Sequence, residues 1–199
     1  MKLHTKHSFI LASESPRRKE IFSRLNIPFG VQPANIDEKV EGSYTPEDLA
    51  IKIANLKAIA IAEINPDAVV IGADTTVRIG KLLLSKPTNK EEAKQFLKLL
   101  SGRVHNVITG VSIRGAGISL AFAESTLVKF YELSDEQIDA YVESGDSLDK
   151  AGGYGIQTMS GLFVEKIQGD YNNVVGLPIS RLFQTLLQLQ LIEISKGVN

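Results

Sequence analysis

The stretch that decides the fold is AVVIGAD, at residues 68–74. It follows the helix-breaking pair Asn65-Pro66 and stays apolar as far as Ala73. A short apolar run that begins at such a breaker is typical of a strand buried on both faces in a parallel or mixed sheet. We therefore predict a strand over residues 68–73 that places Asp74 at its carboxyl tip, where open α/β sheets bind ligands.

Signals on both sides of this strand predict an alternation of strands and helices. Residues 9–12 form an apolar run, and Ser15 and Pro16 then supply a cap and a first residue for a helix that should end near Leu25. Apolar periodicity and capping predict further helices over 46–65, 89–100, 135–144 and 178–190, strands over 104–114, 118–131 and 162–166, and a glycine-rich loop over 145–157. The fold class is therefore α/β with a mixed sheet, and we expect one domain over residues 1–199.

Composition excludes several classes of protein. The chain has no cysteine, which removes disulfides, thiolate metal sites and cysteine nucleophiles and suits a reducing compartment. No apolar run approaches the roughly 18 residues of a membrane span, and the N-terminus lacks a signal-peptide core. The net charge of -1 argues against a nucleic-acid binder, which needs an excess of positive charge. We expect a cytoplasmic protein without a membrane or nucleic-acid partner.

The stretch SESPRR, at residues 13–18, is a candidate phosphate cradle. It joins a buried strand to a helix start, where unpaired backbone N–H groups attract anions. Arg17 and Arg18 could add guanidinium groups, which match phosphate oxygens bidentately. The alternative is that both arginines are merely solvated.

Four other positions carry candidate chemistry. Asp74 could hold a metal ion or activate water, or could be a turn former bonded to its own backbone. Lys57 and Lys86 could contact phosphates, although each alone is more typical of a surface lysine. Gln157 ends a glycine-rich loop and offers an amide that could read a base edge.

The histidines favour structural interpretations. His105 could be catalytic, but a lone histidine is more often a hydrogen-bonded structural group. His4 and His7 lack further zinc ligands. Neither the Rossmann glycine motif nor the P-loop motif occurs in the chain.

Taken in order, these motifs resemble the Maf family of nucleotide pyrophosphatases, from Ile10 to about Leu187. The stretches that carry the resemblance are LASESPRR (11–18), GADT (72–75), KP (86–87), SGRVH (101–105), DKAGGYGIQ (149–157) and GDYNNVVGLP (169–178). The resemblance implies an inosine-triphosphatase-like fold, in which a long curved mixed sheet separates two lobes around a cleft.

The resemblance also implies a role for each site residue. Asp74 would be the proton acceptor, and Asp74 and Glu38 would handle water and a divalent cation, Mg²⁺ or Mn²⁺. Five residues would hold the phosphates, namely Ser13, Arg17, Arg18, Lys57 and Lys86. Three residues would tune substrate choice, namely Arg17, Thr75 and Gln157.

The implied activity is hydrolysis of dTTP and UTP, or of modified pyrimidine nucleotides, to the monophosphate and pyrophosphate. This would be a nucleotide-pool housekeeping role with a link to cell-division arrest.

Two positions depart from the family pattern. Thr76 stands where valine or isoleucine is usual, and Thr158 stands where glycine is usual. Open alternatives are a non-catalytic nucleotide-binding regulator of septum formation and a pyrophosphatase for another base such as 7-methyl-GTP. An RNA-binding module conflicts with the charge balance. The oligomeric state stays open, with a homodimer as one possibility.

Overall fold

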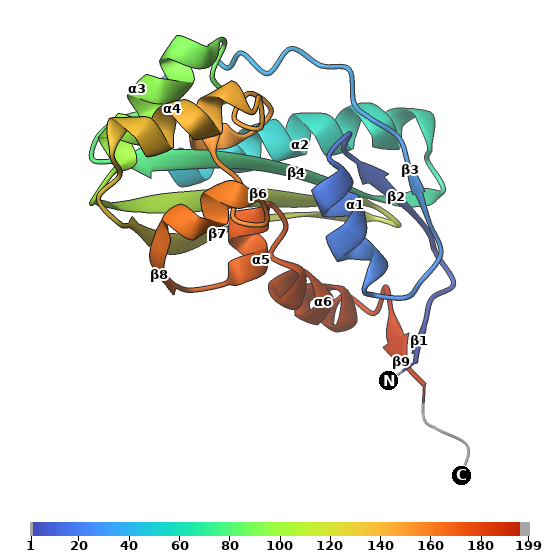
Figure 1. Cartoon of the computed structure of the whole chain (residues 1–199). Coiled ribbons are helices and arrows are strands. Elements are labelled where there is room, and N and C mark those ends of the chain that lie inside the picture. Colours follow the sequence, from blue (N-terminus) through green and yellow to red (C-terminus); the bar gives the residue numbers. More distant parts are fainter. Residues whose placement is uncertain (1, 196–199) are drawn as a thin grey trace.

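A seven-stranded mixed sheet runs through the centre of the protein (Figure 1). The computed structural model describes residues 2–195. The strand order is β3-β2-β4-β6-β7-β8, and β5 pairs with β4. Strand β2 is parallel to β3 and β4, while the other pairings are antiparallel. The strands are β2 (Ser8–Ala12), β3 (Phe29–Val31), β4 (Ala68–Ile79), β5 (Leu82–Leu84), β6 (Val104–Gly115), β7 (Ile118–Phe130) and β8 (Val164–Gln168).

The predicted end of the central strand is wrong. Strand β4 does not stop at Ala73 but continues to Ile79, so Asp74 lies in the middle of the strand. The β-branched residues Thr75, Thr76 and Val77 favour extended backbone. In addition, β6 pairs with β4 without interruption from Val70 to Arg78.

Strand β4 nevertheless has a gap on its other edge. The parallel partner β2 ends with the pair Ala12↔Gly72, and the antiparallel partner β5 begins at Val77↔Leu84. Within the described chain, residues 73–76 therefore pair only with β6, and we call them the notch. Asp74 thus lies just beyond the carboxyl end of β2, which preserves the predicted kind of position for a ligand.

The helices agree with the predictions to within about two residues at each end, apart from one that the sequence did not reveal. Ser15 and Thr45 cap the first two helices as predicted. The missed helix, α5, is only one turn and a half long, too short for periodicity to detect. The helices are α1 (Pro16–Ser23), α2 (Pro46–Ile64), α3 (Lys90–Leu100), α4 (Asp135–Glu143), α5 (Tyr171–Val175) and α6 (Ile179–Gln188).

The remaining elements are short. The predicted strand over 162–166 is displaced to β8, because residues Met159–Phe163 form a 3₁₀ turn before it. A second 3₁₀ turn, Ala151–Gly153, interrupts the predicted glycine-rich loop. Strands β1 (Leu3–His4) and β9 (Glu193–Ile194) pair near the two ends of the described chain. None of the helices in residues 2–195 is long and apolar enough to cross a membrane.

Helix α2 lies very close to one face of the sheet (Figure 1). A Cβ atom at Gly72 would lie 2.3 Å from the carbonyl oxygen of Ala54, and one at Gly110 would lie 2.3 Å from that of Ala50. Glycine at these positions therefore lets the helix backbone touch the sheet. This close packing brings Lys57, on the buried side of α2, next to the even-numbered side chains of β4.

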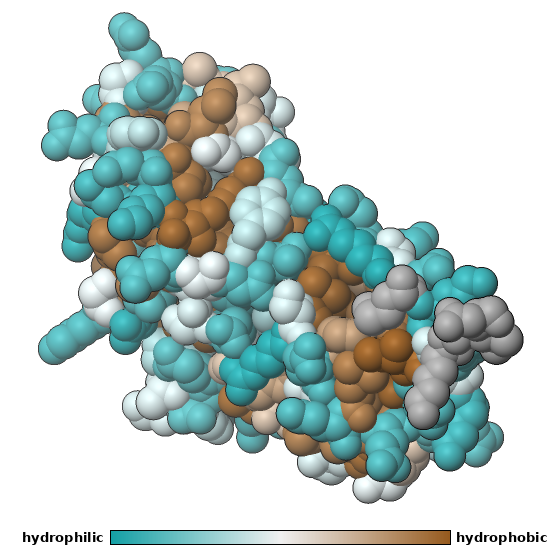
Figure 2. All heavy atoms as spheres, turned by 90° about the horizontal axis from the view of Figure 1, so that it is seen from below, coloured by the Kyte–Doolittle hydropathy of each residue, from teal (hydrophilic) through white to brown (hydrophobic). Residues whose placement is uncertain are grey.

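Two apolar clusters lie on the opposite side of β4. Val69, Ile71 and Ala73 join a cluster with α1 and α6, whereas Val77 and Ile79 join one with α3 and α4. Thr75 lies between them on the same side of the strand. Seen from below, apolar surface gathers in two areas with a hydrophilic band between them (Figure 2). The predicted mixed α/β fold with two lobes is confirmed.

Candidate active site

A cavity of about 480 Å³ opens at the notch. This volume lies within the range of roughly 300–1,000 Å³ that is usual for small-molecule sites. Its walls come from the start of α1, helix α2, the segment 34–38 and the loop 149–158. All nine predicted site residues line it, namely Ser13, Arg17, Arg18, Glu38, Lys57, Asp74, Thr75, Lys86 and Gln157.

The centre of the cavity holds one ammonium group between two carboxylates. Lys57 Nζ lies 2.8 Å from Asp74 Oδ1 and 2.8 Å from Glu38 Oε1. Lys57 and Asp74 are largely buried, whereas Glu38 is half exposed. Burial of the Glu38 carboxyl tends to raise its pKa, but the hydrogen bond and charge of Lys57, with Lys86 and Arg18, outweigh this and lower the pKa. Glu38 is therefore ionised at neutral pH.

Arg18 is fixed on the other side of β4. Its Nε donates to the carbonyl oxygen of Gly176 at 2.8 Å. Its two terminal nitrogens donate to Ser13 Oγ at 3.3 Å and Thr75 Oγ1 at 3.0 Å. Burial lowers the pKa of Arg18 below its ordinary value, against the opposing charge of Asp74, but an arginine remains protonated in proteins. Three of its five N–H groups are thus engaged, which fixes the orientation of the remaining two.

A buried hydrogen-bonded network supports Thr75 from below. Thr75 Oγ1 lies 2.9 Å from Thr109 Oγ1, which in turn donates to the backbone carbonyl of Asn173 at 3.1 Å. The Asn173 amide donates to the Val107 carbonyl and to Thr126 Oγ1, each at 3.0 Å. This network ties α5 to the sheet between the two apolar clusters.

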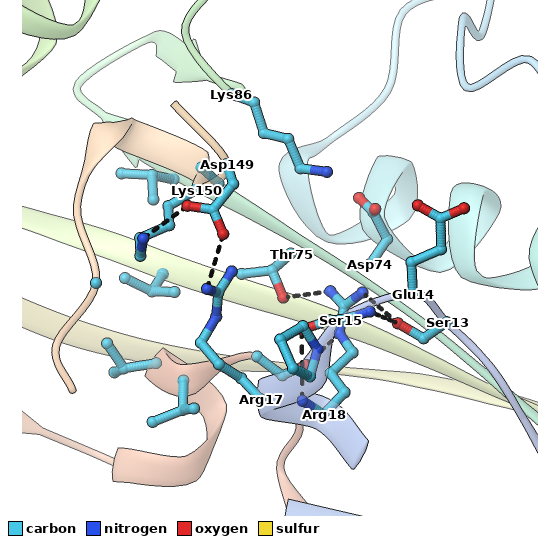
Figure 3. A pocket seen from close by; sticks show the side chains of 18 of the residues that line it. Ser13, Glu14, Ser15, Arg17, Arg18, Asp74, Thr75, Lys86, Asp149 and Lys150 are labelled. Carbon is cyan, nitrogen blue, oxygen red and sulfur yellow. Dashed lines mark hydrogen bonds and ion pairs between the residues drawn. The ribbon is translucent and has the colours of Figure 1, made fainter. Parts of the chain in front are cut away.

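Arg17 has a different partner, which the sequence did not reveal. Its NH1 group lies 3.0 Å from Asp149 Oδ2. Asp149 also accepts from the buried Lys150 at 2.6 Å. The guanidinium and the carboxylate are 132 positions apart in the chain, so no local pattern could have joined them. Figure 3 shows this pair at the edge of the cavity, on the loop side.

The remaining charged side chains of the cavity are exposed. Lys86 and Glu14 both point into it, as does Asp74 (Figure 3). Glu14 lies within the predicted phosphate-binding stretch, but no pattern in the sequence distinguishes its carboxylate. Gln157 is also exposed at the cavity wall.

His105 has no contact with the cavity. It is 1% exposed, and its Nε2 lies 2.8 Å from the hydroxyl of Tyr154. Burial lowers its pKa to about 4, so the ring is neutral at pH 7. These observations support the structural interpretation of this histidine.

The donor set at the centre suits a divalent cation that is shared with a substrate. Among residues 2–195, no group of three or more His, Cys, Asp or Glu side chains could hold a metal by itself. Asp74 and Glu38, however, converge on one point, because both contact Lys57 Nζ. Mg²⁺ is commonly bound by one or two carboxylates together with substrate phosphates. The two carboxylates therefore fit such an ion when phosphate oxygens complete its coordination.

The fold and the cavity together define a mixed α/β protein with a charged cleft, in which lysine and arginine side chains surround paired carboxylates. A similar fold occurs in a solved structure, the Ham1 protein of Staphylococcus aureus, with a TM-score of 0.51 and 16% identity over 92% of this chain and 99% of that one. This likeness concerns the fold alone and agrees with the predicted inosine-triphosphatase-like class.

Sequence comparison identifies the family. A family model described as Maf-like protein matches residues 8–189. A protein of Bacillus anthracis named dTTP/UTP pyrophosphatase is 49% identical, over 92% of this chain and 95% of its own. One of the same name from Bacillus cereus is 48% identical over the same shares. The chain belongs to the Maf-like protein family, as its motifs predicted.

Proposed function

We propose that this protein is a nucleoside triphosphate pyrophosphatase that hydrolyses dTTP and UTP to the monophosphate and pyrophosphate. The observation that carries the proposal is the Lys57–Asp74–Glu38 cluster, which shares one cavity with Arg17, Arg18 and Lys86. The names of the two Bacillus relatives, both dTTP/UTP pyrophosphatase, support the choice of substrates.

Asp74 is the proposed general base. In the reaction, Asp74 takes a proton from a water molecule as the water oxygen attacks the α-phosphorus. The bond from the α-phosphorus to the bridging oxygen breaks, and pyrophosphate leaves with the electron pair. Lys57 lies 2.8 Å from Asp74 and keeps the carboxyl oriented. No covalent intermediate is required, because chemistry at phosphorus depends mainly on positioning and charge.

The cations of the cavity stabilise the negative charge that develops on the leaving group. Arg18, held by three acceptors, directs its two remaining N–H groups without reorganisation. Lys86 and Arg17 add charge from the exposed side, and Ser13 adds a hydroxyl. Asp74 and Glu38 would hold a Mg²⁺ or Mn²⁺ ion, which when bound neutralises charge on the phosphates.

Gln157 is the proposed base-reading residue. Its amide offers a donor and an acceptor, which match the O4 acceptor and the N3–H donor of thymine and uracil. Cytosine reverses this pattern. A site that leaves buried polar groups unpaired discriminates strongly against the wrong ligand. Thr75 and Arg17 would tune the choice further.

The setting of the enzyme follows from the same proposal. We infer that residues 1–199 act as one domain in the cytoplasm on a free nucleotide, without a nucleic-acid partner. The role would be housekeeping of the nucleotide pool, with any effect on cell division exerted through it.

A pyrophosphate-release assay tests the proposal. The panel contains dTTP, UTP, CTP, ATP, GTP and 7-methyl-GTP, each with magnesium or manganese and with a chelator. We expect kcat/KM to be highest for dTTP and UTP and to fall when the metal is removed. Asp74→Asn serves as the inactive control. Turnover of 7-methyl-GTP above dTTP would establish another base, and binding without turnover would establish the non-catalytic regulator.

A further inference from the structure

A series of charged and polar contacts joins the phosphate end of the cavity to the loop that carries Gln157. It begins at the Arg17–Asp149 ion pair and passes through Lys150, which is 6% exposed. Lys150 Nζ lies 2.6 Å from Asp149 Oδ1 and 2.8 Å from Asp146 Oδ1. The series ends at Thr158, whose hydroxyl lies 2.6 Å from Asp146 Oδ2.

Asp146 is the hub of these contacts. Its second oxygen also accepts from the hydroxyl of Tyr141 at 3.0 Å. Burial tends to raise the pKa of Asp146, but the hydrogen bonds from Lys150, Thr158 and Tyr141 lower it overall. An ionised carboxylate with three donors fixes the side chains that contact it more firmly than a neutral acceptor would.

Residues 155–160, which flank Thr158, form a turn held by its own hydrogen bonds. Ser160, which is fully buried, accepts from the Gly155 N–H at 2.9 Å and donates to the Gly155 carbonyl at 2.9 Å. The Thr158 N–H donates to the same carbonyl at 3.1 Å, and the Thr158 hydroxyl, besides its 2.6 Å contact to Asp146, lies 2.9 Å from that carbonyl. A Cβ atom at Gly155 would lie 2.6 Å from Lys150 Cε, so this turn packs directly on the lysine stem.

Gln157 lies between these fixed points. Its neighbour Thr158 is held by Asp146, and Gly155 is held by Ser160 and Lys150. In the part of the chain that the structure describes, the Gln157 side chain has no hydrogen-bond partner, and it is exposed at the cavity wall. The backbone at this position is therefore fixed while the amide remains available to a ligand.

We propose that Thr158 and Asp146 are positioning residues that set base discrimination by holding Gln157 at the cavity wall. This inference rests on the proposed function and deepens it. The contact to Asp146 depends on the Thr158 hydroxyl. A residue without a side-chain hydroxyl at this position could not tether the backbone next to the base-reading amide in this way.

Thr158→Val is the informative change, because it keeps the shape of the side chain and removes the hydroxyl. Thr158→Ser keeps the hydroxyl and is the conservative rescue. Thr185→Val is the control for removing a threonine hydroxyl elsewhere, since the Thr185 hydroxyl donates to the Arg181 carbonyl on α6, away from the cavity. Asp146→Asn removes the charge from the other end of the contact.

The measurement is the ratio of kcat/KM for dTTP to that for CTP, with kcat for dTTP and the thermal midpoint recorded for each variant. We expect Thr158→Val to lower this ratio at least about tenfold while kcat for dTTP stays within about threefold, because Asp74 and Lys57 are untouched. Thr158→Ser and Thr185→Val should keep the wild-type ratio. The double variant Thr158→Val/Asp146→Asn should lose less than the sum of the two single variants, because the Thr158–Asp146 contact is disturbed by both changes.

The outcomes separate the inference from the proposed function. Equal wild-type kcat/KM for dTTP and CTP contradicts the base preference and, with it, the inference. A wild-type preference that survives Thr158→Val contradicts the inference alone. Equal losses for both nucleotides, or additive losses in the double variant, show that Thr158 only stabilises the loop and also overturn the inference.

Discussion

Replacing Lys57 by methionine removes the ammonium group from between Asp74 and Glu38 and keeps an apolar stem of similar length. Removing one partner of a buried ion pair costs about 3–5 kcal/mol, because the other charge is left without compensation. Because Glu38 is half exposed, water can solvate its carboxylate in the variant and offset much of the lost interaction with Lys57. We therefore expect the free energy of unfolding at pH 7 to fall by about 2 kcal/mol, which for a chain of this size lowers the thermal midpoint by roughly 4–8 °C.

The loss should depend on pH, and the sign follows from Glu38. In the wild type, the pKa of Glu38 is lowered, so its charge stabilises the fold above the ordinary glutamate pKa of about 4.3. This contribution disappears as the pH falls through the lowered pKa. The difference between wild type and Lys57→Met should therefore be largest near pH 7 and shrink below about pH 4.

Circular dichroism melts at several pH values, with and without millimolar magnesium, measure both effects. Magnesium should raise the midpoint of the variant more than that of the wild type, because two carboxylates without an ammonium attract a cation more strongly. Lys52→Met, on an exposed part of the same helix, is the control. An unchanged midpoint at pH 7, or a difference independent of pH, would refute the view that Lys57 holds the two carboxylates together.

Three further changes test the site. Asp74→Asn should lower kcat by about two to three orders of magnitude in a folded protein, and near wild-type turnover would make Asp74 a structural residue only. Arg18→Lys should raise KM at least about tenfold, because lysine cannot donate at once to Gly176, Ser13 and Thr75; an unchanged KM would place the phosphates elsewhere. Asp149→Asn should lower KM by up to about fivefold, because it removes an ion pair that competes with the phosphates for Arg17 and is worth at most about 1 kcal/mol. A raised KM would mean that Asp149 assists binding.

Local patterns predicted the elements because the signals lie within a few residues of one another. Ser15 with Pro16, and Thr45 with Pro46, set the starts of two helices. The end of β4 was misjudged for the opposite reason. Whether a strand stops after an apolar run depends on its neighbour, and β6, about 36 residues further on, keeps pairing past Asp74.

The same distinction between local and long-range signals decides which site residues could be predicted from the sequence. The two arginines were visible from residue type and from their place at a helix start. Asp74 was visible from residue type and from a predicted strand end, although its strand in fact continues to Ile79. Glu38 was not, because it lies in a segment without helix or strand, and only the family resemblance pointed to it. Asp146 and Asp149 were not recognised as functional groups, because the contacts that distinguish them are made to residues outside their own sequence neighbourhood, namely Thr158 and Arg17.

The long strands have a consequence for how the molecule comes apart. Strands β4, β6 and β7 each contribute buried side chains to both apolar clusters, so neither cluster has a sheet of its own. Loosening one lobe would fray strands that the other requires, and the two should melt in a single cooperative step. A cavity-forming substitution such as Phe22→Ala, in the cluster of α1, should then speed amide exchange around Val128 in the other lobe. The notch lies where the lobes share their backbone, so its residues keep their relative positions until the whole protein unfolds.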